Sequence, residues 1–131
     1  MRCFSLDEAE ELIPKLEQAF AAVSDIKVRA EAKVSAISVL ERSGGSPAQL
    51  AIERAQLEFL SQSLEALLKN FEALGVVLKG LAPWLADFPF LLEGREVYLC
   101  WQQGEKNLRH FHGTDEGFAD RKALPKNLLP H

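Results

Sequence analysis

The 131-residue sequence has no hydrophobic run long enough to cross a membrane. Its longest weakly polar stretches, Gly75–Leu78 and Trp84–Leu92, are short or interrupted by Asp87 and Pro89, whereas a membrane-spanning helix needs roughly 18 apolar residues. The start also lacks the basic and apolar segments of a secretory leader, because Met1–Phe4 leads directly into an acidic stretch. We therefore expect a cytoplasmic protein with no membrane association.

Cysteine is scarce, and positive charge is not clustered. Cys3 and Cys100 lie at opposite ends of the chain without a C-x-x-C pair, which excludes a disulfide scaffold or a cysteine-rich zinc site and fits a reducing compartment. Residues 1–74 carry eight Lys or Arg against twelve Asp or Glu, and residues 75–131 carry seven of each. Because nucleic-acid binding depends on clustered cations that displace counterions from phosphates, we do not expect a nucleic-acid partner.

Two long helices are predicted for the first part of the chain. Ser5 and Glu8 have the spacing of a capping box, so the first helix begins at Leu6. Pro14 lacks a backbone donor, and we expect a kink or a break near it. The glycine-rich turn Ser43–Pro47 then reverses the chain, and the second helix ends before Gly75.

Both helices carry apolar residues at alternating spacings of three and four, which is typical of a coiled coil. The first stripe comprises Ile13, Leu16, Phe20, Val23, Ala30, Val34 and Ile37. The second comprises Leu50, Leu57, Leu60, Leu64, Leu67, Phe71 and Leu74. Ile52 and Phe59 widen the apolar face of the second helix, and either the C-terminal segment or a second subunit would cover them. The pattern predicts a long antiparallel, coiled-coil-like hairpin over residues 1–74.

Residues 75–131 change to a β-rich pattern, which predicts a small antiparallel sheet of two or three strands. The expected strands are Val76–Lys79, Arg95–Trp101 and Asn107–His112. Pro83–Pro89 is expected to be an aromatic loop, and Gly113–His131 a loop with a helical turn near Glu116–Arg121 and frayed last residues. The whole chain is therefore expected to be one α+β domain.

Seven segments carry a resemblance to the prokaryotic family catalogued as domain of unknown function 2203. They are Phe4–Ala9, Leu12–Leu16, Asp87–Pro89, Gly94–Trp101, Gly104–Glu105, Phe111–His112 and Gly117–Arg121. The run Gly94–Trp101 is the most specific, and Phe111 departs from the family pattern, which more often has tryptophan there. The resemblance covers nearly the whole chain and implies a shared architecture and a cytoplasmic, prokaryotic origin. Because that family has no established activity, it implies no catalytic residues.

Side chains with metal-binding chemistry are grouped in the tail. His110 and His112 are two residues apart, so on a strand they point to one face and can supply two ligands to a transition metal such as zinc. Asp115 or Cys100 would supply a third ligand. A three-residue loop between the strands would place Cys100 on the same face as both histidines, whereas two or four residues would turn it away. The sequence permits either arrangement.

The same region offers two further kinds of site. Arg95 and Arg121 could clamp an anion between them, with Trp101 and His112 lining the site. They could instead pair with Glu96, Asp115 or Asp120. Cys100 with His112 as its base would be a catalytic pair, which requires a lowered thiol pKa. The apolar neighbours of Cys100 argue against a lowered pKa.

Two functional hypotheses remain at this point. The preferred one is a structural or protein-interaction module, in which the helical hairpin mediates formation of a homo-oligomer or docking to a protein partner. The alternative is a small ligand-binding or metal-binding protein, or an enzyme, with its site on the C-terminal β segment. No enzymatic motif favours catalysis.

Overall fold

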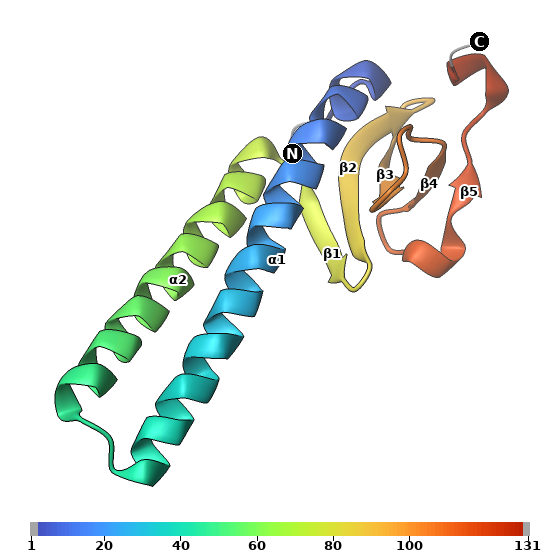
Figure 1. The fold of residues 1–131 in the computed structure, drawn as a ribbon. Helices are drawn as coiled ribbons and strands as arrows, with labels where there is room; N and C mark the ends of the chain where they lie inside the picture. Colours follow the sequence, from blue (N-terminus) through green and yellow to red (C-terminus); the bar gives the residue numbers. More distant parts are fainter. Residues whose placement is uncertain (1–2, 130–131) are drawn as a thin grey trace. The chain divides into compact units, whose positions relative to one another are not determined.

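The computed structural model describes residues 3–129, in which two long helices are followed by a five-stranded antiparallel sheet (Figure 1). The expected α+β class is confirmed. The chain divides into two compact units, a hairpin unit of Gln18–Asn70 and a sheet unit of Met1–Glu17 and Phe71–His131. The start of the first helix thus belongs to the sheet unit. The fraying expected at the C-terminus concerns Pro130 and His131, which lie outside the described residues.

The helices are α1 (Leu6–Ser43) and α2 (Pro47–Leu74), which run in opposite directions on either side of a short turn (Figure 1). The capping box at the start of α1 is present: Ser5 Oγ accepts a hydrogen bond from Glu8 N at 3.1 Å, and Glu8 Oε1 accepts one from Ser5 N at 2.8 Å. Ser46 Oγ likewise caps α2 by accepting from the backbone of the next turn. Side-chain chemistry therefore fixes where both helices begin.

Pro14 does not divide α1 into two helices, as a break at this residue would, but lies inside one continuous helix. Its ring removes one backbone hydrogen bond, and such a proline costs about 3 kcal/mol in an isolated helix. Ala9, Ile13 and Leu16, which flank Pro14 on both sides, are all buried. Their packing holds the helix together across the proline.

The apolar stripes of the hairpin are only partly buried. Ile37 is buried in α1, but Val34 is 55% exposed. In α2, all of which lies within the described residues, only Phe71 is buried. Ion pairs link the helices, with Lys33 Nζ lying 3.0 Å from Glu53 Oε2. This pair explains why the apolar stripe of α2 contains a glutamate at position 53. Neither helix within residues 3–129 has a stretch that is both long and apolar enough for a membrane span.

The sheet has five strands, and not the two or three that we expected. They follow one another in the order β1-β2-β3-β4-β5, so each strand pairs with its neighbours in the sequence. Their bounds are Val77–Leu81 for β1, Trp84–Leu92 for β2, Arg95–Gln102 for β3, His110–Gly113 for β4 and Lys122–Ala123 for β5. Strands β2 and β5 were not predicted. A short 3-10 helix, Phe118–Asp120, lies where we expected a helical turn.

Strand β2 replaces the expected aromatic loop, and its position in the sheet explains how it contains a proline. Strand β1 pairs with β2 only as far as Asp87, so Pro89 lies beyond the end of β1. At this position the backbone carbonyl of Pro89 accepts a hydrogen bond from Phe4 N at 2.7 Å. A proline is tolerated in a strand where no neighbouring strand needs its missing N–H group.

One face of the sheet forms the apolar core. Phe88 is paired with Leu99, and Ala86 with Trp101, and all four residues are fully buried. The Phe4 ring contacts Phe88 edge to face, with ring centroids 5.4 Å apart. The glutamates of α1 anchor the loop after β3, since Glu10 Oε2 accepts from Leu108 N at 2.8 Å and Glu17 Oε1 from Gly104 N at 3.1 Å. The polar residue Asp87 and its strand neighbour Cys100 lie on the opposite face of the sheet.

Candidate functional site

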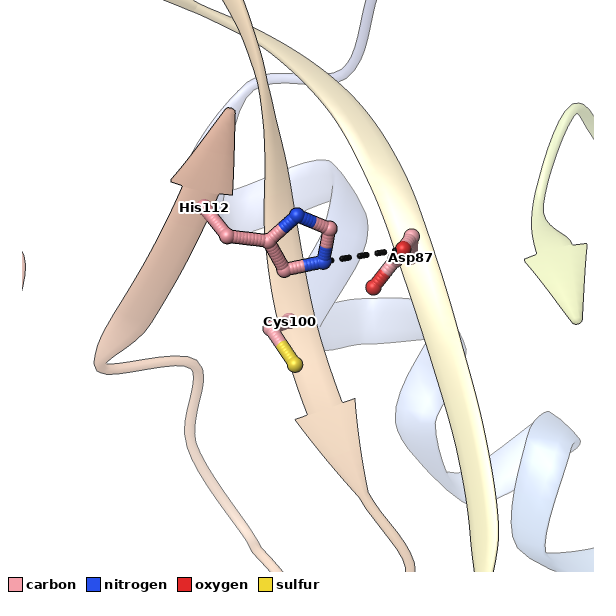
Figure 2. A group of neighbouring side chains, drawn as sticks. All are labelled: Asp87, Cys100 and His112. Carbon is pink, nitrogen blue, oxygen red and sulfur yellow. Dashed lines mark ion pairs between the residues drawn. The ribbon is translucent and has the colours of Figure 1, made fainter. Parts of the chain in front are cut away.

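Three polar side chains converge on the face of the sheet opposite the apolar core (Figure 2). Asp87 on β2 pairs with Cys100 on β3, and His112 on β4 pairs with Tyr98, two residues before Cys100. Because alternate residues of a strand point to the same face, all three project from that face. Asp87, Cys100 and His112 are each only 1% exposed, and their potential ligand atoms lie within 4.8 Å of one another. Three adjacent strands thus bring together one oxygen, one sulfur and one nitrogen.

The register between β3 and β4 decides the question that the sequence left open. Leu99 pairs with Phe111, and residues 103–109 connect the two strands. This connection is longer than the three residues that we considered, but like that loop it contains an odd number of residues, which gives the same alternation of faces. Cys100 therefore lies on the same face as His110 and His112.

The ring of His112 is held at both nitrogens. Its Nδ1 atom lies 2.8 Å from the carbonyl oxygen of Gly113, and because a carbonyl only accepts, Nδ1 carries the proton of this hydrogen bond. Its Nε2 atom lies 3.0 Å from Oδ2 of Asp87 (Figure 2). Burial raises the pKa of the Asp87 carboxyl, and hydrogen bonding from His112 and from the Cys100 thiol partly opposes this effect, although Oδ2 itself is buried without a hydrogen bond of normal geometry. A neutral His112 would direct the lone pair of Nε2 towards this oxygen, so an ionised Asp87 requires a proton on Nε2 or a metal ion between the two atoms.

The electrostatics of the site do not favour a cysteine nucleophile. Burial raises the pKa of the Asp87 carboxyl, and the charges of His112 and Lys79 only partly oppose this effect. Burial, followed by the negative charge of Asp87, raises the pKa of Cys100 to about 12, so the free side chain is a thiol at neutral pH. Both nitrogens of His112 face oxygen atoms, and neither acts on the thiol as a base. The geometry does not support the catalytic pair of Cys100 and His112.

A pocket of about 240 Å³ opens above the three side chains. Its lining residues are Lys79, Leu85, Asp87, Cys100, His112, Glu116, Gly117 and Phe118. Glu116 belongs to the turn that follows β4, and its Oε1 atom accepts from Gly113 N at 2.7 Å and from Lys122 Nζ at 3.1 Å. The hydrogen bond from Gly113, together with Lys122, lowers the pKa of Glu116. The pocket therefore has a buried polar floor and a rim carrying opposite charges.

His110 and Asp115, which were also predicted as metal ligands, are not part of the group formed by Asp87, Cys100 and His112. His110 is half-buried on the same face as His112, but it is not a member of the group within 4.8 Å. Its Nδ1 atom is buried and has no hydrogen-bond partner among the described residues. Asp115 is exposed in the turn after β4 and is also outside the group. The H-x-H pair thus supplies one of the three buried side chains.

The guanidinium of Arg121 is occupied by contacts within the protein. Its Nη2 atom donates to the backbone carbonyl of Cys100 at 3.1 Å and to the carboxylate oxygens of Glu105 at 3.1 and 3.2 Å. The guanidinium also lies 4.6 Å from the centre of the Phe118 ring. Arg121 is therefore paired with an acidic side chain, but the partner is Glu105. It is not Glu96, Asp115 or Asp120, which we had considered.

Arg95 and Trp101 lie away from the site. Both occupy odd-numbered positions of β3, whose side chains point to the face opposite Cys100. Trp101 is fully buried, and its indole nitrogen donates to the backbone carbonyl of Glu105 at 2.8 Å. Arg95 is exposed at the start of the strand. The described structure therefore does not assemble the anion clamp that we considered for Arg95, Arg121 and Trp101.

Sequence reasoning missed the acidic and basic residues of the pocket, Asp87, Lys79 and Glu116, and also missed Leu85, Gly117 and Phe118. Asp87 had a detectable signal, because it is the one charged residue in the apolar segment Trp84–Leu92. A buried carboxylate in an apolar strand needs a partner, and the nearby histidines are candidates. Lys79 and Glu116 had no comparable signal, since their positions depend on a bulge in β1 and on the turn after β4.

Comparisons with known proteins agree with the resemblance noted in the sequence. A search of curated proteins and a search of solved structures each found no match. A family model described as "Uncharacterized conserved protein (DUF2203)" matches residues 2–124. The match includes every residue of the site and nearly the whole chain. The protein therefore belongs to the DUF2203 family, for which no function is described.

Proposed function

We propose that this protein binds one divalent transition-metal ion through Asp87, Cys100 and His112. Carboxylate, thiolate and imidazole are the ligands found in protein zinc sites, and the presence of sulfur and nitrogen disfavours Mg²⁺ and Ca²⁺, which prefer oxygen. Zn²⁺ fits this donor set best. The proposal develops the alternative hypothesis of a metal site on the β segment, with Asp87 as the third ligand.

The contact between His112 Nε2 and Asp87 Oδ2 carries this proposal. The two atoms are 3.0 Å apart, and Oδ2 lacks a hydrogen bond of normal geometry. Two ligands at about 2.0 Å from a tetrahedral zinc ion are about 3.3 Å apart, which is close to this separation. Sulfur at about 2.3 Å from zinc would lie about 3.6 Å from either atom. Because all three atoms already lie within 4.8 Å, a small movement of Cys100 would complete the set.

The charges of the ligands also match a divalent cation. A bound metal deprotonates a cysteine ligand, so one thiolate and one carboxylate would neutralise the two positive charges of Zn²⁺. The proton on Nδ1 of His112 leaves the Nε2 lone pair for the metal, and the Gly113 carbonyl fixes the orientation of the ring. We also propose a cytoplasmic location, because a reducing compartment would keep Cys100 available as a ligand.

Zinc titration of the metal-free protein, prepared without an affinity tag, tests the proposal. We expect one equivalent to bind to the wild type and to Cys3→Ser, and no stoichiometric binding to Cys100→Ser. The two variants are matched controls, since each exchanges one sulfur atom for oxygen. Equal zinc binding by Cys3→Ser and Cys100→Ser would contradict the assignment of Cys100 as a ligand.

The two histidines provide a second matched pair. We expect His112→Gln to lose the zinc site and His110→Gln to retain it, because only His112 belongs to the group of three. Circular dichroism would confirm that both variants are folded before the titration. If both variants bind one zinc ion as tightly as the wild type, the metal proposal fails.

We also propose that the protein self-associates through the hairpin unit. The observation that favours this second function is the exposure of Ile52 and Phe59, which are 56% and 69% exposed and lie seven residues apart on α2. Residues at this spacing share one helix face, and exposed apolar faces of this kind pair in helical bundles. Val39 of α1 lines the same surface groove as Ile52, which extends the apolar surface. A second copy of the hairpin is the partner that we propose.

Sedimentation velocity tests self-association. We expect the wild type to form a dimer or a larger species at about 100 µM, and Phe59→Glu to shift it towards monomer. Ser61→Glu adds the same charge at an exposed position two residues from Phe59, on the opposite side of α2, and serves as the control. A wild-type protein that stays monomeric at this concentration would exclude the proposal.

A further inference from the structure

Three protein ligands leave a tetrahedral metal ion with one open coordination position, as in catalytic and ligand-binding zinc sites. In this protein the three side chains form part of the lining of the pocket above them. The remaining lining residues therefore determine what the open position can accept. They include two charged side chains, Lys79 and Glu116, and two large apolar side chains, Leu85 and Phe118.

Lys79 supplies a positive charge on one side of the pocket. It lies at a bulge in β1, where the register with β2 shifts between Leu78 and Gly80. Its Nζ atom lies 5.4 Å from the centre of the Tyr98 ring, and its charge acts on Asp87. Among residues 3–129, no ion pair with a carboxylate is found for this ammonium group. Once Asp87 is bound to a metal, the ammonium would be the uncompensated charge at the pocket.

The negative charge on the other side of the pocket is already compensated. The carboxylate of Glu116 accepts hydrogen bonds from Gly113 N and from Lys122 Nζ, at 2.7 and 3.1 Å. These donors hold Glu116 in its ionised form and make it a weak base. Glu116 therefore neither cancels Lys79 nor is well suited to remove a proton from metal-bound water. The surroundings favour ligand binding over hydrolysis.

We infer that the pocket binds a small oxyanion, a carboxylate or a phosphate, which takes the open position of the metal and pairs with Lys79. This inference rests on the proposed metal site. A metal neutralised by Asp87 and Cys100 leaves Lys79 as the net charge, and an anionic oxygen satisfies both the metal and the ammonium. The pocket of about 240 Å³ has the volume of about eight liquid water molecules, which limits the ligand to a small molecule. Leu85 and Phe118 would contact its apolar part.

Cobalt substitution tests the inference, because the visible spectrum of Co²⁺ reports both its ligands and its coordination number. The protein is loaded with one equivalent of Co²⁺, and binding is verified by the thiolate-to-cobalt absorption band. Sodium acetate and inorganic phosphate are then titrated separately in a non-coordinating buffer at constant ionic strength. We expect saturable changes in the cobalt bands, and the tighter of the two anions identifies the ligand as a carboxylate or a phosphate.

Lys79→Met and Lys126→Met are the matched variants, since both remove an exposed lysine but only Lys79 lines the pocket. We expect Lys79→Met to bind Co²⁺ normally and to weaken anion binding about tenfold, as for loss of a charge-assisted hydrogen bond. Lys126→Met should match the wild type. If cobalt binds but neither anion alters its spectrum, or if Lys79→Met binds anions as tightly as the wild type, the oxyanion inference is wrong while the metal site stands. If no cobalt binds, both proposals fail.

Discussion

Asp87 is the buried acidic residue on the polar face of the sheet. A carboxylate that is 1% exposed would be strongly destabilising without compensation, and burial raises its pKa accordingly. The partners near it are His112, 3.0 Å away, and Cys100 on the next strand. An apolar residue of similar size would avoid this cost. An acid at this buried position is what the proposed metal site requires.

Replacing Asp87 with asparagine separates these two roles. The asparagine amide has the same shape and can donate to Nε2 of His112, so we expect the metal-free protein to lose no more than about 1.5 kcal/mol of stability. Zinc affinity should fall by at least about 100-fold, because a neutral amide replaces an anionic ligand. Chemical unfolding and zinc titration measure the two effects. Asp115→Asn, at an exposed position, is the control, and unchanged zinc affinity in Asp87→Asn would rule out Asp87 as a ligand.

The thiol of Cys100 should be almost inert when no metal is present. With a pKa of about 12, its thiolate fraction at pH 8 is about 10⁻⁴, so thiol reagents should modify it at least about a thousandfold more slowly than an ordinary cysteine. The rate should increase about tenfold per pH unit, because the thiolate fraction increases with pH until it approaches the pKa. The measurement compares Cys3→Ser, which retains Cys100, with Cys100→Ser. Equally fast modification of the two variants in the native state would contradict the burial of Cys100.

At the scale of elements, helix α1 contains a proline at an exposed position, where packing of the side chain does not call for a proline. Pro14 is exposed, while its neighbours Ile13 and Leu16 are buried. We expect Pro14→Ala to restore the hydrogen bond to the carbonyl of Glu10 and to stabilise the protein by about 1–3 kcal/mol. Thermal unfolding followed by circular dichroism measures this change, with Lys15→Ala as the control. A lower unfolding temperature in Pro14→Ala would show that a bend at the proline is needed for packing.

The helices were more predictable than the sheet, and the reason lies in how local their signals are. Ser5 and Glu8 lie within one turn, and the bonds they make depend only on that turn. Strand β2 was missed because Pro89 normally marks the end of a strand. Its tolerance depends on where β1 stops pairing, which is not a local property of the sequence. Strand β5 has only two residues, too few for any periodicity.

The site was predictable only in part. His112 and Cys100 were recognised by their chemistry, but the face to which Cys100 points depended on the length of the connection from β3 to β4. Asp87 was hidden in a segment expected to be a loop. Arg95 and Trp101 were included because of their proximity in sequence, although alternation along β3 places them on the other face. Assembling the site required the register of three strands.

At the scale of the whole molecule, metal binding and folding of the sheet should be coupled. The three ligands come from three strands, so a bound ion would link β2, β3 and β4. At a free zinc concentration of 100 times Kd, binding stabilises the folded state by about 2.7 kcal/mol. We expect the unfolding temperature of the sheet to rise by roughly 10 °C. Tryptophan fluorescence reports it, because Trp84 and Trp101 both lie in the sheet unit.

Cys100→Ser provides the control for this coupling. Zinc should raise the unfolding temperature of the wild type and of Cys3→Ser, and a chelator should reverse the effect. The same additions should leave Cys100→Ser unchanged. A wild-type protein whose unfolding temperature is the same in zinc and in chelator would contradict the coupling of metal binding to the sheet.

X-ray absorption at the zinc K edge of the protein loaded with one equivalent of Zn²⁺ tests the central claim most directly. The account predicts one sulfur at about 2.3 Å and nitrogen or oxygen neighbours at about 2.0–2.2 Å, in a four-coordinate site. The sulfur should disappear from the spectrum of Cys100→Ser and remain in that of Cys3→Ser. A wild-type spectrum with only nitrogen and oxygen neighbours would contradict the site formed by Asp87, Cys100 and His112.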